Sequence, residues 1–170
     1  QLVTKTVQSP KTFAAVPAQK RYVEQTTPKN EVVIAPYDAK NIYMVQLHNE
    51  NQEWSADRAP VIALFNEYFG GSMNAIVFQE LREARGLAYS AFARYDEPYR
   101  LGDKESFYTY IITQNDKMMD CVHEFNKLLN DMPVRQAGFD LAKQSLMKSL
   151  ASARTTKYGI LTSYLAAQRL

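Results

Sequence analysis

The sequence predicts an α+β fold in which helices pack on one face of a mainly antiparallel sheet. Three runs rich in β-branched and aromatic residues predict strands at 42–48, 87–95 and 106–113. Apolar residues recur at helical spacing in the stretches between and after these runs. The predicted order is therefore one strand, two helices, two strands joined as a hairpin, and then further helices. Strands and helices that are grouped in this way are typical of α+β domains.

The first part of the chain differs in composition from the rest. Residues 1–30 are polar, contain three prolines and show little hydrophobic periodicity. We interpret them as a linker or arm, with at most a short strand at 21–23. Residues 31–170 are expected to form one domain.

The first strand of that domain is predicted from the apolar run IYMVQLH at 42–48. β-Branched and aromatic side chains fill it, and these are the residues that strands favour. Residues 49–56 are polar and are expected to form a loop.

A helix is predicted after this loop. Ser55 or Asp57 is a candidate N-cap, and Pro60 suits the first helical turn. Gly70 and Gly71 are expected to end the helix, because glycine readily adopts the left-handed conformation past a helix end. The apolar residues at helical spacing are Val61, Leu64, Phe65 and Tyr68.

A second helix is predicted to begin at Ser72 or Asn74 and to stop at Gly86. The strands at 87–95 and 106–113 follow it and form the hairpin. The expected apolar stripe of the second helix is Met73, Ile76, Val77, Leu81 and Ala84.

Helices are predicted for the remainder of the chain. Asn115 or Asp116 is expected to cap an amphipathic helix, and Pro133 follows its end. A further helix is expected at 136–153, and a last one begins near Tyr158. The expected inward residues are Met118, Val122, Phe125 and Leu129 in the former and Phe139, Ala142, Leu146, Leu150 and Ala153 in the latter.

The bulk composition argues against several classes of protein. Apolar residues make up 46% of the 170 and charged residues 22%, as in an ordinary globular domain. A net charge of +2 with dispersed Lys and Arg does not provide the concentrated basic face that nucleic acid requires. No apolar run approaches the roughly 20 residues that cross a bilayer. The single cysteine, Cys121, is compatible with either the cytoplasm or the cell envelope, so the compartment stays open.

Few residues that could carry metal or nucleophile chemistry are present. A catalytic zinc usually has three protein ligands, often with two histidines one helical turn apart. Here there are only His48 and His123, on different predicted elements, so a site built from them and a distant carboxylate is the weaker reading. Cys121 has no neighbouring Cys or His and is expected to be a buried, inert thiol. Ser72 lies outside any G-x-S-x-G motif and is better explained as a helix cap.

The most informative stretch is the end of the second predicted helix and the strand that follows it. Arg82 lies in the last helical turn, Gly86 ends the helix, and Tyr89 begins the strand. A reversal at Gly86 would bring the two side chains together, where a guanidinium fork and a phenol O–H could bind peptide carbonyls and a developing oxyanion. In the alternative reading, Arg82 and Arg85 only complement the negative end of the helix, and Tyr89 is an ordinary strand residue.

The segment FGGSMNAIVFQELREARGLAYS, residues 69–90, closely resembles the C-terminal-half signature of the pitrilysin/insulinase zinc peptidases, or inverted zincins. In that family a Gly-Gly pair precedes a helix, an LRE-x-x-GLAY sequence follows, and the strand runs on. A looser likeness extends from about Asn30 to the end of the chain. The chain is thereby identified as similar to the zinc-less, C-terminal domain of such a peptidase.

This resemblance implies a specific arrangement. Two halves of the same metallopeptidase-half, processing-peptidase-like fold enclose a chamber, and the N-terminal half carries H-x-x-E-H and the zinc. The zinc-less half contributes an Arg and a Tyr that reach the substrate. Arg82 and Tyr89 match their context, which implies that both bind substrate and that Tyr89 also hydrogen-bonds the oxyanion. This chain is then expected to hold no metal, and its partners are a peptide or small protein substrate and the zinc-bearing half.

Three further expectations follow from the resemblance. The family domain usually continues into a final strand and helix, so the domain at 31–170 is expected to be incomplete, with an open sheet edge that could pair with another copy. The chain alone is expected neither to bind catalytic zinc nor to cleave peptides. The main alternative is a non-catalytic scaffold, like the partner subunit of the processing peptidase or the respiratory-complex core proteins; an unrelated α+β binding domain is a third. An H-x-x-E-H motif in the parent polypeptide would favour the active peptidase.

Overall fold

The computed structural model describes residues 14–18, 20, 22, 28–98, 100 and 102–168. Within them, three antiparallel strands form a sheet in the order β1-β3-β2, in which β2 and β3 form the predicted hairpin. The strands are β1 (Asn41–Glu53), β2 (Ser90–Asp96) and β3 (Lys104–Gln114). The helical segments are α2 (Ala59–Phe65), η1 (Asn66–Gly70), α3 (Ile76–Phe78), η2 (Gln79–Ala84), η3 (Asn115–Lys117), α4 (Met118–Asn130), α5 (Gln136–Ser152) and α6 (Lys157–Ala167).

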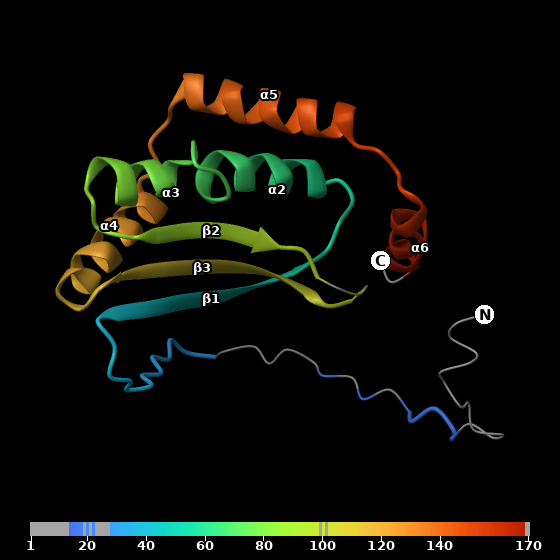
Figure 1. Cartoon of the computed structure of the whole chain (residues 1–170), viewed down its shortest axis with the longest axis horizontal. Coiled ribbons are helices and arrows are strands. Elements are labelled where there is room, and N and C mark those ends of the chain that lie inside the picture. Colours follow the sequence, from blue (N-terminus) through green and yellow to red (C-terminus); the bar gives the residue numbers. More distant parts are fainter. Residues whose placement is uncertain are drawn as a thin grey trace, which may run out of the picture.

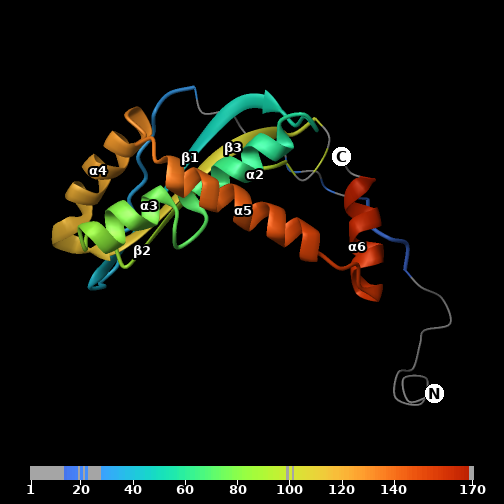
Figure 2. The same ribbon diagram turned by 90° about the horizontal axis from the view of Figure 1, so that it is seen from above.

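The helices that pack on the sheet all lie on one of its sides, which confirms the predicted α+β arrangement (Figure 1). η1 and α3 rest on β2, and α5 lies over α2 and η1 as an outer layer. α4 follows β3 at one end of the sheet and packs against β3 and η2 (Figure 2). η2 therefore contacts both β2 and α4.

The two faces of the sheet differ in burial because side chains alternate along each strand. On the central strand β3, Phe107 and Ile111 point into the core. Tyr110 points to the opposite face, where its ring centre lies 6.3 Å from that of Tyr43 and 5.3 Å from that of Phe92. The core between sheet and helices is built mainly from Phe69, Ile76, Val77, Leu81, Ala91, Ala93, Phe107, Ile111, Cys121 and Phe125.

Strand β1 is longer than predicted. The sequence indicated a loop from residue 49, but the strand runs on to Glu53 after an irregularity between Asn49 and Glu53. Asn51 adopts a positive φ of 53° inside this irregularity. Beyond it, Glu53 pairs again with Lys104, whose ammonium lies 2.8 Å from the Glu53 carboxylate. Pairing with β3 therefore overrides the local polar composition.

The first predicted helix ends where predicted, but for a different reason. α2 continues into the π-helical turn η1, which ends at Gly70, yet neither Gly70 nor Gly71 has a positive φ. Gly70 instead lies directly on β2: a Cβ atom there would be 1.9 Å from the carbonyl oxygen of Ala93. At this position glycine permits a close approach of two backbones rather than a left-handed cap.

The predicted helix caps are not formed. The residue preceding α2 is Arg58, and neither Ser55 nor Asp57 caps the helix through its side chain. α3 begins at Ile76, later than predicted, and the Ser72 hydroxyl donates to the carbonyl of Glu67 at the end of the preceding turn. Asn115 and Asp116 lie in the 3₁₀ turn η3 and cap nothing. The predicted stripes also included Val61, Met73 and Ala84, which are exposed.

The buried faces of the later helices differ from the predicted ones. α4 buries Cys121, Phe125 and Leu128, whereas the predicted stripe shares only Phe125 with this set. α5 buries only Ala142, and Leu150 is 65% exposed. Because α5 forms the outer layer and packs on α2 and η1, most of its apolar residues have no described segment to cover them.

α6 is the last helix of the described residues. α6 begins close to the predicted Tyr158, and the Thr156 side chain caps it by accepting the N–H of Gly159. In the part of the chain that the structure describes, no helix is both long and apolar enough to span a bilayer. Most of the predicted arm lies outside the described residues, including positions 21 and 23 of the short strand predicted at 21–23.

Candidate functional site

The structure brings Arg82 and Tyr89 together on one exposed face, as predicted. η2 carries Arg82, the chain reverses at Gly86, and Tyr89 lies immediately before β2. The guanidinium carbon of Arg82 is 5.8 Å from the centre of the Tyr89 ring and 4.9 Å from that of Phe78. The Arg82 side chain is 45% exposed and Tyr89 is 76% exposed, so both are open to a ligand.

Backbone hydrogen bonds hold the turn between the two residues. Gly86 has a φ of 57°, the left-handed conformation expected at a helix end. Its N–H donates to the carbonyl of Arg82 at 3.0 Å, and the N–H of Leu87 donates to the carbonyl of Leu81 at 2.8 Å. The Lys117 ammonium donates to the carbonyl of Gly86 at 3.2 Å. The spacing between Arg82 and Tyr89 is thus set by the main chain.

Side chains beneath the turn fix the beginning of the strand. The carbonyl of Leu87 accepts hydrogen bonds from the Thr113 hydroxyl and from the Cys121 thiol, the latter at 3.3 Å. The N–H of Tyr89 donates to the carbonyl of Ile112 at 2.9 Å. Burial raises the pKa of the Cys121 thiol, which therefore stays neutral and serves as a donor; the predicted burial of this cysteine is confirmed.

The two arginines at the end of η2 have different environments. The Arg85 guanidinium lies 3.3 Å from the Glu124 carboxylate and 3.7 Å from that of Glu80. Among the described residues, the one carboxylate near Arg82 is that of Glu83, at 3.8 Å, and Arg82 otherwise stacks on aromatic rings. Arg85 is therefore engaged in holding helices together, whereas most of the donor fork of Arg82 is available to a ligand.

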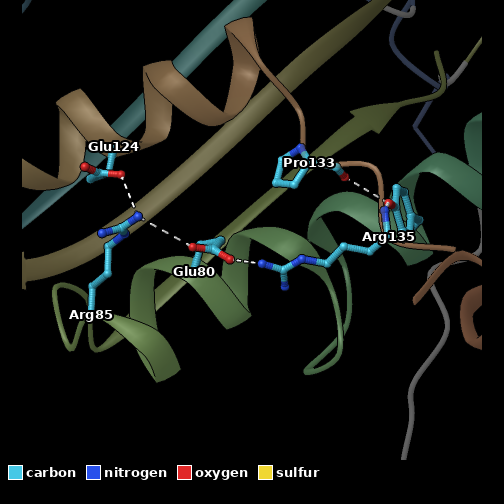
Figure 3. A network of polar contacts seen from close by, with 6 residues as sticks. Glu80, Arg85, Glu124, Pro133 and Arg135 are labelled. Atoms are coloured by element: carbon cyan, nitrogen blue, oxygen red, sulfur yellow. Dashed lines mark hydrogen bonds and ion pairs between the residues drawn. The ribbon is translucent and has the colours of Figure 1, made fainter. Parts of the chain in front are cut away.

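Glu80 is the centre of an ion-pair network that the sequence did not reveal (Figure 3). Its side chain is only 16% exposed and receives Arg135 on one carboxylate oxygen and Arg85 on the other. Glu124 of α4 completes the network through Arg85. The network thereby joins three elements: η2, α4 and the segment before α5. Its centre, Glu80, lies two residues before Arg82 in the sequence.

A second link lies beside this network. The Tyr68 hydroxyl donates to the carbonyl of Pro133 at 3.0 Å and accepts the N–H of Arg135 at 2.9 Å. The Tyr68 ring also packs edge-on against Phe139 of α5 at 5.8 Å. The α4–α5 connection is therefore attached to η1 as well as to η2, which restricts the helical layer that carries Arg82.

The Glu80→Gln variant is expected to lower the free energy of unfolding by about 1 kcal/mol, because the carboxylate holds two partly exposed arginines together. Chemical denaturation followed by circular dichroism measures this change. Glu83→Gln is the matched control on the same turn: Glu83 is exposed and, within the described residues, pairs with Arg82 alone, so a loss below about 0.5 kcal/mol is expected. Equal losses in both variants would show that Glu80 is not the centre of the network.

The predicted metal-binding inventory can be compared directly with the structure. His48 is exposed on β1 and His123 is exposed on α4, on separate elements. Across the described residues, no group of three or more His, Cys, Asp or Glu side chains could hold a metal ion. The chemistry of the Arg82–Tyr89 face is instead that of hydrogen-bond donors: a permanently charged planar fork and a neutral phenol O–H.

One contributor to the site was missed by the sequence reasoning. Phe78 stacks under the Arg82 guanidinium and limits its orientations. The four-residue spacing between Phe78 and Arg82 on a helix was the available signal, because side chains at this spacing are neighbours. The Tyr89 hydroxyl has no hydrogen-bond partner within the described part of the chain, so its donor is directed to solvent or to a ligand.

Comparison with known proteins gives two findings. The family model described as the peptidase M16 inactive domain matches residues 3–146. Among solved structures, the fold is similar to the crystal structure of a peptidase M16 inactive domain from Pseudomonas fluorescens, with a TM-score of 0.59 and 17% sequence identity over 78% of this chain. The match covers 30% of that protein's chain. No functionally curated protein matches at a significant level.

Proposed function

The chain belongs to the peptidase M16 inactive-domain family, and we propose that it is the substrate-binding, zinc-less half of a zinc metalloendopeptidase. In this proposal a zinc-bearing half, in the same polypeptide or in a partner subunit, is of the pitrilysin/insulinase type and encloses a peptide together with this domain. The resemblance of residues 69–90 to the signature of those enzymes supports the assignment. In the same proposal, the domain extends over residues 31–170.

The observation that carries the proposal is the pairing of two donors on one exposed face. Arg82 and Tyr89 are close, both open to a ligand, and held in place by a backbone turn. A purely structural arginine would resemble Arg85, which carboxylates surround. Arg82 differs from it in the way expected of a ligand-binding residue.

In the proposed mechanism, this domain positions the peptide and stabilises charge. The guanidinium fork of Arg82 donates to substrate carbonyl oxygens and fixes the register of the chain. The phenol O–H of Tyr89 donates to the carbonyl oxygen of the scissile bond as negative charge develops on it. The zinc of the other half supplies Lewis-acid chemistry and an activated water. Neither Arg82 nor Tyr89 needs to transfer a proton.

Replacing Arg82 by Lys tests the substrate-binding role. Lys keeps the charge and loses the planar fork, so the KM of the assembled enzyme is expected to rise roughly tenfold, the equivalent of one or two hydrogen bonds. Steady-state kinetics on a quenched fluorescent peptide measures the change. Arg85→Lys is the matched control, because this neighbouring arginine pairs with carboxylates and its replacement should leave KM unchanged.

The isolated chain provides the reference for this assay. The 170-residue chain without the zinc half is expected to cleave no peptide and to retain no stoichiometric zinc after dialysis. Chelator-sensitive cleavage by the pure chain would contradict the proposal. If Arg82→Lys and Arg85→Lys both show wild-type KM, the domain functions as a scaffold instead.

A further inference from the structure

A cavity of about 340 Å³ lies between the sheet and the helical layer, at the opposite end of β2 from Tyr89. Tyr95 is among its lining residues and is six residues further along, roughly 20 Å at the rise of a strand. The ends of the strands, η1 and the C-terminal turn of α4 surround the cavity. Its volume lies within the range of small-ligand pockets, roughly 300–1,000 Å³.

Aromatic rings form the inner wall of this cavity. The ring of Phe65 stacks on that of Phe69, with 5.1 Å between the ring centres, and meets the ring of Tyr95 edge-on, with 5.4 Å between the centres. Phe107 lies 5.1 Å from Tyr95 and continues the same cluster. Phe69 and Phe107 are buried, so the wall is held by the core and is preformed. A cavity with such a wall favours an apolar guest.

The rim of the cavity has a different chemistry. Leu129 and Met132 are partly exposed there, at 37% and 38%, and His48 and Glu50 lie exposed at the edge of β1. Glu50 forms no ion pair within the described residues. Arg58, whose charge acts on the lining residue Tyr95, pairs with the buried carboxylate of Glu105 at 3.0 Å and is thereby neutralised. The charge that the rim offers to a guest is therefore negative.

The properties of Tyr95 agree with this reading. Burial, and then the Glu50 carboxylate, raise the pKa of the Tyr95 phenol. The phenol thus remains a neutral donor near the rim. A cation placed deep in the cavity would lose its hydration against apolar walls, whereas a cation at the rim would keep water and meet Glu50.

We propose that this cavity binds a large apolar side chain of a peptide, such as phenylalanine, whose neighbouring basic residue pairs with Glu50. The inference rests on the proposed function only in taking a peptide as the guest. It adds a second anchor for the peptide, remote from the Arg82–Tyr89 face. A peptide held at both places is bound by two linked contacts, which raises its effective affinity.

Titration of the 170-residue chain with the dipeptide acetyl-Phe-Lys-amide tests the proposal. Methyl NMR signals of Leu128, Leu129 and Met132, which line the cavity, are expected to shift with a Kd on the order of 1 mM. Acetyl-Ala-Lys-amide should bind at least tenfold more weakly, because it lacks the side chain that the cavity buries. Acetyl-Phe-Glu-amide should bind a fewfold more weakly, and added salt should narrow that difference.

Two substitutions localise the binding. Met132→Trp places a larger side chain at the rim and should abolish the shifts. Glu50→Lys should weaken acetyl-Phe-Lys-amide and favour acetyl-Phe-Glu-amide, whereas the control Glu31→Lys, an exposed carboxylate outside the lining, should change neither. Thermal melts establish that each variant is folded.

Several results would overturn the inference. These are the absence of shifts at the lining residues, equal binding of the Phe and Ala dipeptides, or full binding by Met132→Trp. Shifts that depend on protein concentration without any dipeptide would assign the cavity to a second copy of the chain and would also overturn it. The titration needs no zinc half and no turnover, so its failure is separate from a failure of the Arg82 experiment.

Discussion

Tyr89→Phe in the assembled enzyme is expected to lower kcat by roughly 10²–10³-fold, the usual cost of losing one donor to a developing oxyanion. Phenylalanine retains the ring and therefore the contact with the Arg82 guanidinium, 5.8 Å from the ring centre. The substitution removes only the hydroxyl. Because that hydroxyl serves the transition state in our proposal, KM should change little.

Stability measurements separate this result from a folding defect. The Tyr89 side chain is largely exposed, and its hydroxyl forms no hydrogen bond within the described residues, so the melting temperature should stay within about 2 °C of wild type. Tyr158→Phe provides the matched control, since Tyr158 is an equally exposed tyrosine on α6. Wild-type turnover in Tyr89→Phe would show that this residue has no catalytic role here.

Gly70→Ala is expected to cost about 3 kcal/mol or more of stability, and to lower the melting temperature by about 10 °C. The added Cβ would lie 1.9 Å from the carbonyl oxygen of Ala93, 2.6 Å from its carbonyl carbon and 2.7 Å from its nitrogen. All three atoms are main chain, so no side-chain rotation relieves the clash. η1 must separate from β2, which opens the core around Phe69.

Gly138→Ala is the matched control for this prediction. A Cβ at Gly138 meets only Tyr68 at 3.5 Å and Arg135 at 3.7 Å, which are ordinary contacts. Because Gly138 lies inside α5, alanine should stabilise the chain there by about 0.5–1 kcal/mol. Urea unfolding of the two variants should thus give changes of opposite sign. A loss below 1 kcal/mol for Gly70→Ala would contradict the close contact between η1 and β2.

Much of the architecture followed from local patterns. The β-branched and aromatic runs predicted three strands and the antiparallel hairpin, because apolar and polar residues alternate along the strands of a half-buried sheet and this alternation is visible in the sequence. Gly86 was correctly identified as the end of the helix, since few other residues tolerate its φ of 57°. The helices at 118–130 and 136–152 also matched closely.

Other features could not be predicted from local pattern. Asn66–Gly70 and Gln79–Ala84 are π-helical, and neither composition nor spacing distinguishes a π turn from an α turn. The buried face of α4 centres on Cys121 and Leu128 because β3 and η2 lie on that side. Which apolar residues of a helix are buried depends on where its neighbours are, and that is a property of the whole fold.

For the candidate site, the sequence by itself determined the order of its parts: an arginine in a last helical turn, a glycine, and a tyrosine at the start of a strand. That order sets a short main-chain reversal, and a short reversal brings its flanking side chains together irrespective of the surroundings. Only the tertiary structure decided which arginine is available. Glu124 comes from α4 and, together with Glu80, pairs with Arg85. Arg135 comes from the segment before α5 and pairs with Glu80, which holds η2 and leaves Arg82 open. Ion pairs across 39 to 55 residues of chain depend on how the helices pack, and no local pattern records this packing.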